Sequence, residues 1–151
     1  RHGDLVSVGK YRQDGYLPEA IINFLARLGW SYDDKEEIFS VDDLIEKFDI
    51  NRVGKTNGVF DIEKLQWLNG HYIMERDLSA RTDAVIPFLR GAGLLETDLS
   101  PERRVWLEKI VEAIGDRLTT LADITSQTSY FFVDDFEYDP KAVKKWWKKD
   151  F

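Results

Sequence analysis

Hydrophobic residues recur at every third or fourth position through most of the chain, which is the spacing of an amphipathic α-helix. The clearest example begins at Pro18, because proline is tolerated at the first position of a helix. Gly29 is expected to end this helix. Its apolar stripe consists of Ala20, Ile21, Phe24, Leu25 and Leu28. The pattern therefore predicts a helix over residues 18–28.

A second helix is predicted directly after Ser40. Ser40 and Asp43 have the spacing of a capping box, in which each side chain binds the backbone N–H of the other residue. The apolar positions that follow are Val41, Leu44, Ile45 and Phe48. Residues 51–60 contain several glycines and asparagines, so this stretch is predicted to be a loop.

Asp61 is a suitable N-cap for a third helix, which is predicted over residues 62–68. Asn69 and Gly70 come next, and both residue types readily adopt the left-handed conformation that ends helices. We therefore expect this helix to be short and to stop at Asn69.

Three more helices are expected in the second half of the chain. Ser79 can cap a helix that reaches residue 90, and Pro87 is expected to kink or shorten it because proline lacks the N–H donor. The next helix is predicted over residues 101–114, and the last one begins at Pro140. No segment shows the strict alternation of a β-strand, so the predicted fold class is mainly α, with about six helices.

The polar segment MERDLS separates the first three predicted helices from the others. A boundary near Asp77 would divide the chain into two helical subdomains, residues 1–76 and 77–151.

With 151 residues, 43% of them hydrophobic, the chain is long enough to build a hydrophobic core. It contains no cysteine and no apolar run of the roughly 20 residues that a membrane helix needs, which favours a reducing cytoplasm and excludes a membrane role.

Sites for catalysis are not visible in the sequence, which has no glycine-rich phosphate loop and no nucleophile elbow. His2 and His71 are the two histidines. They are separated by most of a subdomain, and a lone histidine is more often a surface or core-edge residue than a ligand, so no metal site is predicted. Trp67 and Tyr72 flank Asn69 and could present flat rings to a base or a ribose. Packing in the core is the alternative, and composition alone favours it.

Five segments together resemble the C-terminal part of the bacterial glutamyl-tRNA synthetases, a class I family. They are RHGDLVSVGKYRQDGYLPEAIINFLARLGWS, VFDIEKLQWLNGHYI, PFLRGAGL, DRLTTL and YFFVDDFEYDPKA, in the order that the family has them. The second segment matches the family block FD-x-x-KL-x-W-x-N-x-x-Y. The resemblance covers nearly the whole chain.

The resemblance implies a fragment that begins at the end of the KLSKR-type signature, with Arg1 as its last letter, on the ATP side of the site. The catalytic domain would then be absent, so we expect no aminoacylation by the fragment and no cofactor in it. In the parent, ATP and Mg²⁺ would serve the reaction. The expected partners are tRNA(Glu), the missing N-terminal catalytic domain and the missing C-terminal anticodon-binding subdomain. A cytoplasmic monomer is implied.

The resemblance also assigns roles to the two halves. Residues 1–76 would be the stem-contact domain, and residues 77–151 the first, truncated part of the α-helical anticodon-binding domain. Arg117 aligns with an arginine that reads the third anticodon nucleotide in discriminating members, and a guanidinium suits an unstacked base edge. The other expected tRNA-binding residues are Lys64, Trp67, Asn69, Tyr72 and Arg52, with Lys64 as a phosphate contact.

The net charge of −7 argues against a general affinity for nucleic acid, so any binding face must be local. Candidates for such a basic face are Arg1, Lys10, Arg12, Arg52, Lys55, Lys64 and Arg117. Two alternatives remain open: a helical protein-interaction module that binds no RNA, and the same region of a relaxed-specificity Glu/Gln synthetase.

Overall fold

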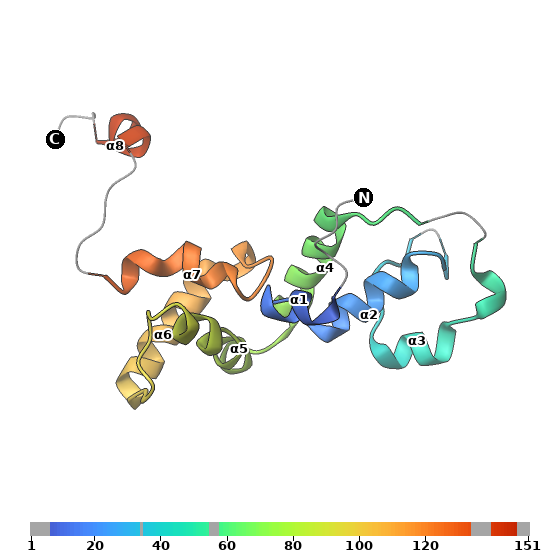
Figure 1. The fold of residues 1–151 in the computed structure, drawn as a ribbon, viewed down its shortest axis with the longest axis horizontal. Helices are drawn as coiled ribbons and strands as arrows, with labels where there is room; N and C mark the ends of the chain where they lie inside the picture. The colour runs from blue at the N-terminus through green and yellow to red at the C-terminus, as the bar shows by residue number, and fades with distance from the viewer. Residues whose placement is uncertain (1–6, 34, 55–57, 134–139, 148–151) are drawn as a thin grey trace.

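The structure is a computed structural model that describes residues 7–33, 35–54, 58–133 and 140–147. Within these ranges it is helical, with no strand and a single isolated bridge between Trp30 and Val53 (Figure 1). The α-helices are α1 (Val8–Gln13), α2 (Pro18–Arg27), α3 (Val41–Lys47), α4 (Ile62–Glu75), α5 (Leu78–Gly91), α6 (Pro101–Ile114), α7 (Asp123–Thr128) and α8 (Pro140–Trp146). The short 3₁₀ helices are η1 (Ile50–Arg52), η2 (Gly115–Arg117) and η3 (Ser129–Phe131). The predicted mainly α fold class is confirmed.

Helices α2, α3 and α6 begin where the sequence predicts. The capping box of α3 is present, because the Ser40 hydroxyl accepts a 3.0 Å hydrogen bond from Asp43 N and Asp43 accepts one of 3.1 Å from Ser40 N. In α6 the hydroxyl of Ser100 accepts a hydrogen bond from Arg103 N at 3.2 Å. Local capping chemistry therefore fixes these starts.

Helix α4 is twice as long as predicted, because it continues through Asn69 and Gly70 to Glu75. The expected end at Asn69 is wrong for a tertiary reason. The Asn69 side chain is used in hydrogen bonds to other parts of the fold, and the turns that follow it bury Tyr72 and Ile73. Burial of this face outweighs the local tendency of asparagine and glycine to end a helix.

Helix α5 is capped by Asp77, which accepts a 2.8 Å hydrogen bond from Ala80 N, and not by the predicted Ser79. The Ser79 hydroxyl instead accepts a hydrogen bond of 3.0 Å from Arg104 Nη2 on α6. The helix continues past Pro87 to Gly91, so the proline does not end it at that point.

Two short helices, α1 and α7, were not predicted at all. Each has six residues, too few to show a hydrophobic period or to be stable alone. Asp123 holds the turn before α7, because its carboxylate accepts a 2.7 Å hydrogen bond from Thr120 N. Neither helix has a side-chain cap, so contacts with the rest of the fold are needed to form them.

The two halves of the chain share one hydrophobic core. Figure 1 shows α1 to α4 at one end of this assembly and α5, α6 and α7 at the other. A continuous cluster of buried residues joins them, including Leu17, Phe24, Leu65, Ile73, Val85, Leu89, Leu107, Val111, Leu118 and Ile124. A small second cluster consists of Trp30, Phe39 and Leu44 beside α3. Helix α4 lies between the halves and packs on both α2 and η2.

Candidate functional site

Helix α4 carries four of the predicted site residues, and they lie on two different faces. Trp67 is 50% exposed, and its ring stacks on His71 with the ring centroids 6.5 Å apart. Lys64 is one turn earlier, so it lies on the same side of the helix as Trp67. Asn69 and Tyr72 are buried. The outer face of α4 therefore offers a ring and a cation, whereas the inner face holds the fold together.

Asn69 has no exposed surface, and its amide is fully used inside the protein. Its Oδ1 accepts a 2.7 Å hydrogen bond from Leu17 N. Its Nδ2 donates to the carbonyl oxygen of Thr119 at 2.7 Å and to that of Gly15 at 3.4 Å. As placed, this side chain cannot touch a ligand on the surface.

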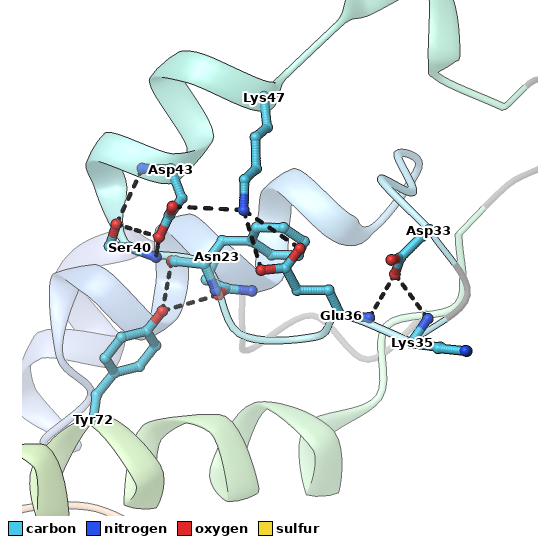
Figure 2. A network of polar contacts seen from close by, with 9 residues as sticks. Asn23, Asp33, Lys35, Glu36, Ser40, Asp43, Lys47 and Tyr72 are labelled. Atoms are coloured by element: carbon cyan, nitrogen blue, oxygen red, sulfur yellow. Dashed lines mark hydrogen bonds and ion pairs between the residues drawn. The ribbon is translucent and has the colours of Figure 1, made fainter.

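Tyr72 points into the protein toward Asn23, as Figure 2 shows. Its hydroxyl oxygen lies 2.7 Å from the carbonyl oxygen of Phe39 and 2.9 Å from Asn23 Oδ1. Burial raises the pKa of Tyr72 to about 12, so the phenol remains a neutral donor. The geometry gives Tyr72 a structural contact and no open surface for a base.

Asn23 is the second fully buried amide, and it holds the segment before α3. Its Oδ1 accepts a hydrogen bond from Phe39 N at 2.5 Å, and its Nδ2 donates to the carbonyl oxygen of Glu37 at 3.1 Å. Lys47 lies on the other side of this segment and pairs with Glu36 at 3.1 Å (Figure 2). Asn23 thereby fixes the backbone that carries Glu37.

Glu37 in turn holds two cations. Lys64 Nζ lies 2.6 Å from Glu37 Oε1, and Arg27 Nη1 lies 3.1 Å from the same oxygen. The hydrogen bond from Lys64, followed by the one from Arg27, lowers the pKa of the Glu37 carboxyl. Two cations thus share one carboxylate beside α4, and the Lys64 side chain remains partly exposed.

Arg52 is the exposed last residue of η1. Its guanidinium lies over the ring of Tyr32, 5.5 Å from the centroid, and its Nη2 donates to the carbonyl oxygen of Tyr32. These contacts hold the side chain against the segment that follows α2. Within the described ranges, no hydrogen bond, ion pair or ring contact joins Arg52 to Lys64, Trp67 or Arg117.

Arg117 ends η2, immediately after the turn at Gly115, where φ is +57°. The side chain is exposed and makes no hydrogen bond or ion pair with any other described residue. Its neighbours are fixed, because Ile114 and Leu118 on either side are buried in the core. The structure therefore presents an unpaired guanidinium on an anchored turn.

The remaining basic candidates are divided. Lys10 pairs with Asp14 at 2.6 Å, and Arg12 is exposed on the same short helix α1. Arg1 and Lys55 lie outside the described residues.

The sequence analysis did not identify Gly15, Asn23 and Thr119, whose hydrogen bonds hold the site residues or the segments that carry them. Nothing in a single sequence marks their partners, because each contact joins residues far apart in the chain.

Nowhere among the described residues do three or more His, Cys, Asp or Glu side chains gather in a way that could hold a metal ion. The described residues therefore offer no fit for Mg²⁺. None of the helices in the described ranges is both long and apolar enough to cross a membrane.

Comparison with known proteins gives two family models in sequence order. "tRNA synthetases class I (E and Q), catalytic domain" matches residues 1–67, and "Anticodon binding domain" matches residues 80–150. The boundary expected near Asp77 falls in the gap between the two matched ranges.

Relatives and solved structures are similar to nearly the whole chain. The glutamate–tRNA ligase of Moorella thermoacetica is 43% identical over 96% of this chain and 29% of its own length. That of Geotalea uraniireducens is 47% identical over 96% of this chain and 30% of its own length. A crystal structure of a glutamate tRNA ligase from Elizabethkingia meningosepticum in complex with its amino acid matches with a TM-score of 0.76 and 36% identity, over 92% of this chain and 26% of that one.

The chain thus spans about 30% of the length of the curated relatives that it matches. The order of the two family models, the identity over nearly all 151 residues and the shared helical fold agree with one another. Over the length that it spans, the chain belongs to the glutamate–tRNA ligase family of class I tRNA synthetases.

Proposed function

We propose that this chain is the tRNA-binding part of a glutamate–tRNA ligase. Residues 1–76 contact the stem side of tRNA(Glu), and residues 77–151 contribute to anticodon recognition. The observation that carries the proposal is Arg117, which is exposed and has no partner among the described residues, on an anchored turn inside the range that matches an anticodon-binding domain. The chain binds as a monomer in the cytoplasm, where tRNA charging supplies the ribosome.

Arg117 is the residue proposed to read the third anticodon nucleotide. A guanidinium is a planar fork of donors, which suits the acceptors on the edge of an unstacked base. Anticodon bases in a splayed loop expose such edges. Because Arg117 has no internal partner among the described residues, it loses no protein hydrogen bond when it binds RNA.

The outer face of α4 is proposed to meet the tRNA backbone. Lys64 supplies charge for a phosphate, and the half-exposed ring of Trp67 offers a surface for a ribose or a base. Arg52 is a further proposed contact. Asn69 and Tyr72 support these residues from the core, since both are buried.

The chain by itself is proposed not to charge tRNA. Arg1, which the resemblance places on the ATP side of the active site, lies outside the described residues. ATP and Mg²⁺ are proposed to serve the reaction of the full-length enzyme. Supplying tRNA(Glu), glutamate and ATP to this chain is expected to give no glutamyl-tRNA, and charged product would contradict the proposal.

Binding is tested by fluorescence titration of the chain with tRNA(Glu) at about 50 and 200 mM salt, the range over which phosphate contacts weaken most. Affinity that falls steeply between the two salt concentrations supports the proposal. Absent or salt-insensitive binding contradicts it and favours a helical protein-interaction module. A transcript of tRNA(Glu) without its anticodon arm serves as the control for stem contact.

A further inference from the structure

A single buried side chain connects the stem half of the chain to the turn that carries Arg117. Asn69 lies on α4, and its Nδ2 donates a 2.7 Å hydrogen bond to the carbonyl oxygen of Thr119, two residues after Arg117. Its Oδ1 accepts from Leu17 N at the start of α2. The amide therefore fixes α2 and the Arg117 turn to the same point of α4.

Backbones approach closely on both sides of this amide. A Cβ atom at Gly70 would lie 3.3 Å from the carbonyl oxygen of Leu118, so α4 touches the turn directly. Leu121 N donates a 3.0 Å hydrogen bond to the carbonyl oxygen of Gly15. We call this set of contacts the Asn69 junction; its members are Gly15, Leu17, Asn69, Gly70, Leu118, Thr119 and Leu121.

A buried amide costs free energy unless its hydrogen bonds are made, and an apolar side chain could fill the same space. Unlike an apolar side chain, the amide fixes the position and orientation of its backbone partners, because a hydrogen bond is strong only over a narrow range of distance and angle. The exposed Arg117 makes no hydrogen bond or ion pair with another described residue, so its place is set by the backbone on either side. The Asn69 junction fixes that backbone relative to α4.

We propose that Asn69 is a positioning residue for anticodon recognition, which holds Arg117 at a set place relative to the face of α4 that carries Lys64 and Trp67. This inference rests on the proposed function. A tRNA can contact the Arg117 turn and this face of α4 at the same time. If the protein already holds the two surfaces at the correct spacing, no free energy is spent on ordering them when the tRNA binds. Loss of the junction should therefore weaken anticodon discrimination more than stem contact.

The variant Asn69→Asp tests this. It keeps an acceptor for Leu17 N but turns a carboxylate toward the carbonyl oxygens of Thr119 and Gly15. The measured quantity is the ratio of dissociation constants for tRNA(Glu) with G or with native C at the third anticodon position. Asn23→Asp is the matched control, since Asn23 is an equally buried amide that binds Glu37 and not the Arg117 turn.

A milder variant, Gly70→Ala, covers the case in which Asn69→Asp does not fold. The added Cβ would lie 3.3 Å from the carbonyl oxygen of Leu118, so it should displace the turn slightly. The change removes no hydrogen bond, and alanine has a higher helix propensity than glycine. Folding of every variant is checked by circular dichroism. Amide hydrogen exchange at Leu121 reports the junction without RNA, and both junction variants should raise it while Asn23→Asp should not.

For Asn69→Asp, or Gly70→Ala in its place, we expect a discrimination ratio within about twofold of that of Arg117→Gln, with no further loss in the double variant because both changes act on one interaction. Asn23→Asp should keep the wild-type ratio. A wild-type ratio in both junction variants, or unchanged exchange at Leu121, would overturn the inference. A wild-type protein that binds both RNAs equally would instead contradict the proposed role of Arg117, and the inference with it.

Discussion

Asn69 on α4 donates a 2.7 Å hydrogen bond to the carbonyl oxygen of Thr119, fifty residues later in the chain. Asn69 lies just after residues 1–67, which match a synthetase catalytic-domain model, and Thr119 lies within residues 80–150, which match an anticodon-binding domain. Since the two halves also share one hydrophobic core, motion of one half is restrained by the other.

Gly15→Ala is expected to destabilise the fold by at least ~2 kcal/mol, because the left-handed conformation alone costs an alanine about 1–2 kcal/mol. Gly15 has a φ of +86°, and a Cβ there would lie 2.5 Å from Ala122 N. Gly91→Ala is the matched control, since nothing lies within 4 Å of its Cβ position and it is within α5. Urea unfolding of both variants gives the comparison; equal stabilities would contradict the close approach at Gly15.

Stability is expected to depend on Tyr72 at high pH. Burial raises its pKa from 10.0 to about 12 in the folded state, so the unfolded chain loses this proton first as pH rises. The contribution of Tyr72 is complete below pH 10 and is lost between about pH 10 and pH 12. The free energy of unfolding of the wild type should therefore fall more steeply over this range than that of Tyr72→Phe. Parallel curves for the two proteins would show that the phenol is not buried as described.

Acid should weaken the start of α3. The Ser40 hydroxyl and backbone N–H lower the pKa of the Asp43 carboxyl, so its contribution to stability is present above the unfolded pKa and is lost as pH falls through the lower folded value. Asp43→Asn should be less stable than the wild type at pH 7 and should approach it at acidic pH. A constant difference between the two, followed by urea unfolding from pH 7 to pH 2, would contradict this role of the capping box.

Lys64 and Glu37 should have opposite effects on RNA binding. Lys64→Ala removes a phosphate contact and is expected to weaken tRNA(Glu) binding by about three- to tenfold and to lower the salt slope by about one. Glu37→Gln removes the carboxylate that Lys64 and Arg27 share, so it should strengthen binding. Titrations at several salt concentrations measure both effects. Weaker binding by a folded Glu37→Gln variant would show that the two cations do not face the RNA.

The parts of the fold that depend on local chemistry could be predicted from the sequence. Capping by Ser40 and Ser100 and the apolar stripe after Pro18 gave the starts of three helices correctly. The end of α4 could not be predicted in this way, because Asn69 bonds to residues about fifty positions away on either side. The local preference of asparagine is to end a helix, whereas the tertiary hydrogen bonds of Asn69 favour a helix that continues. The tertiary contacts outweigh the local preference.

The residues of the candidate site could be predicted only in part, again because helix α4 is longer than expected. Sequence motifs pointed to Trp67, Asn69 and Tyr72 as one group, but the helical period turns Trp67 outward and the other two inward. Had the helix been expected to continue past Asn69, this division could have been seen from the sequence. The partners Gly15 and Thr119 could not, since nothing in their own neighbourhoods indicates a contact with α4.

The most direct test of the central claim compares the wild type with Arg117→Gln. For each protein, fluorescence titration gives the dissociation constants for tRNA(Glu) with native C and with G at the third anticodon position. We expect the wild type to prefer the native anticodon by about tenfold or more, the size of one lost charged hydrogen bond, and Arg117→Gln to lose most of that preference. Equal preference in the two folded proteins would contradict the claim that Arg117 reads the anticodon.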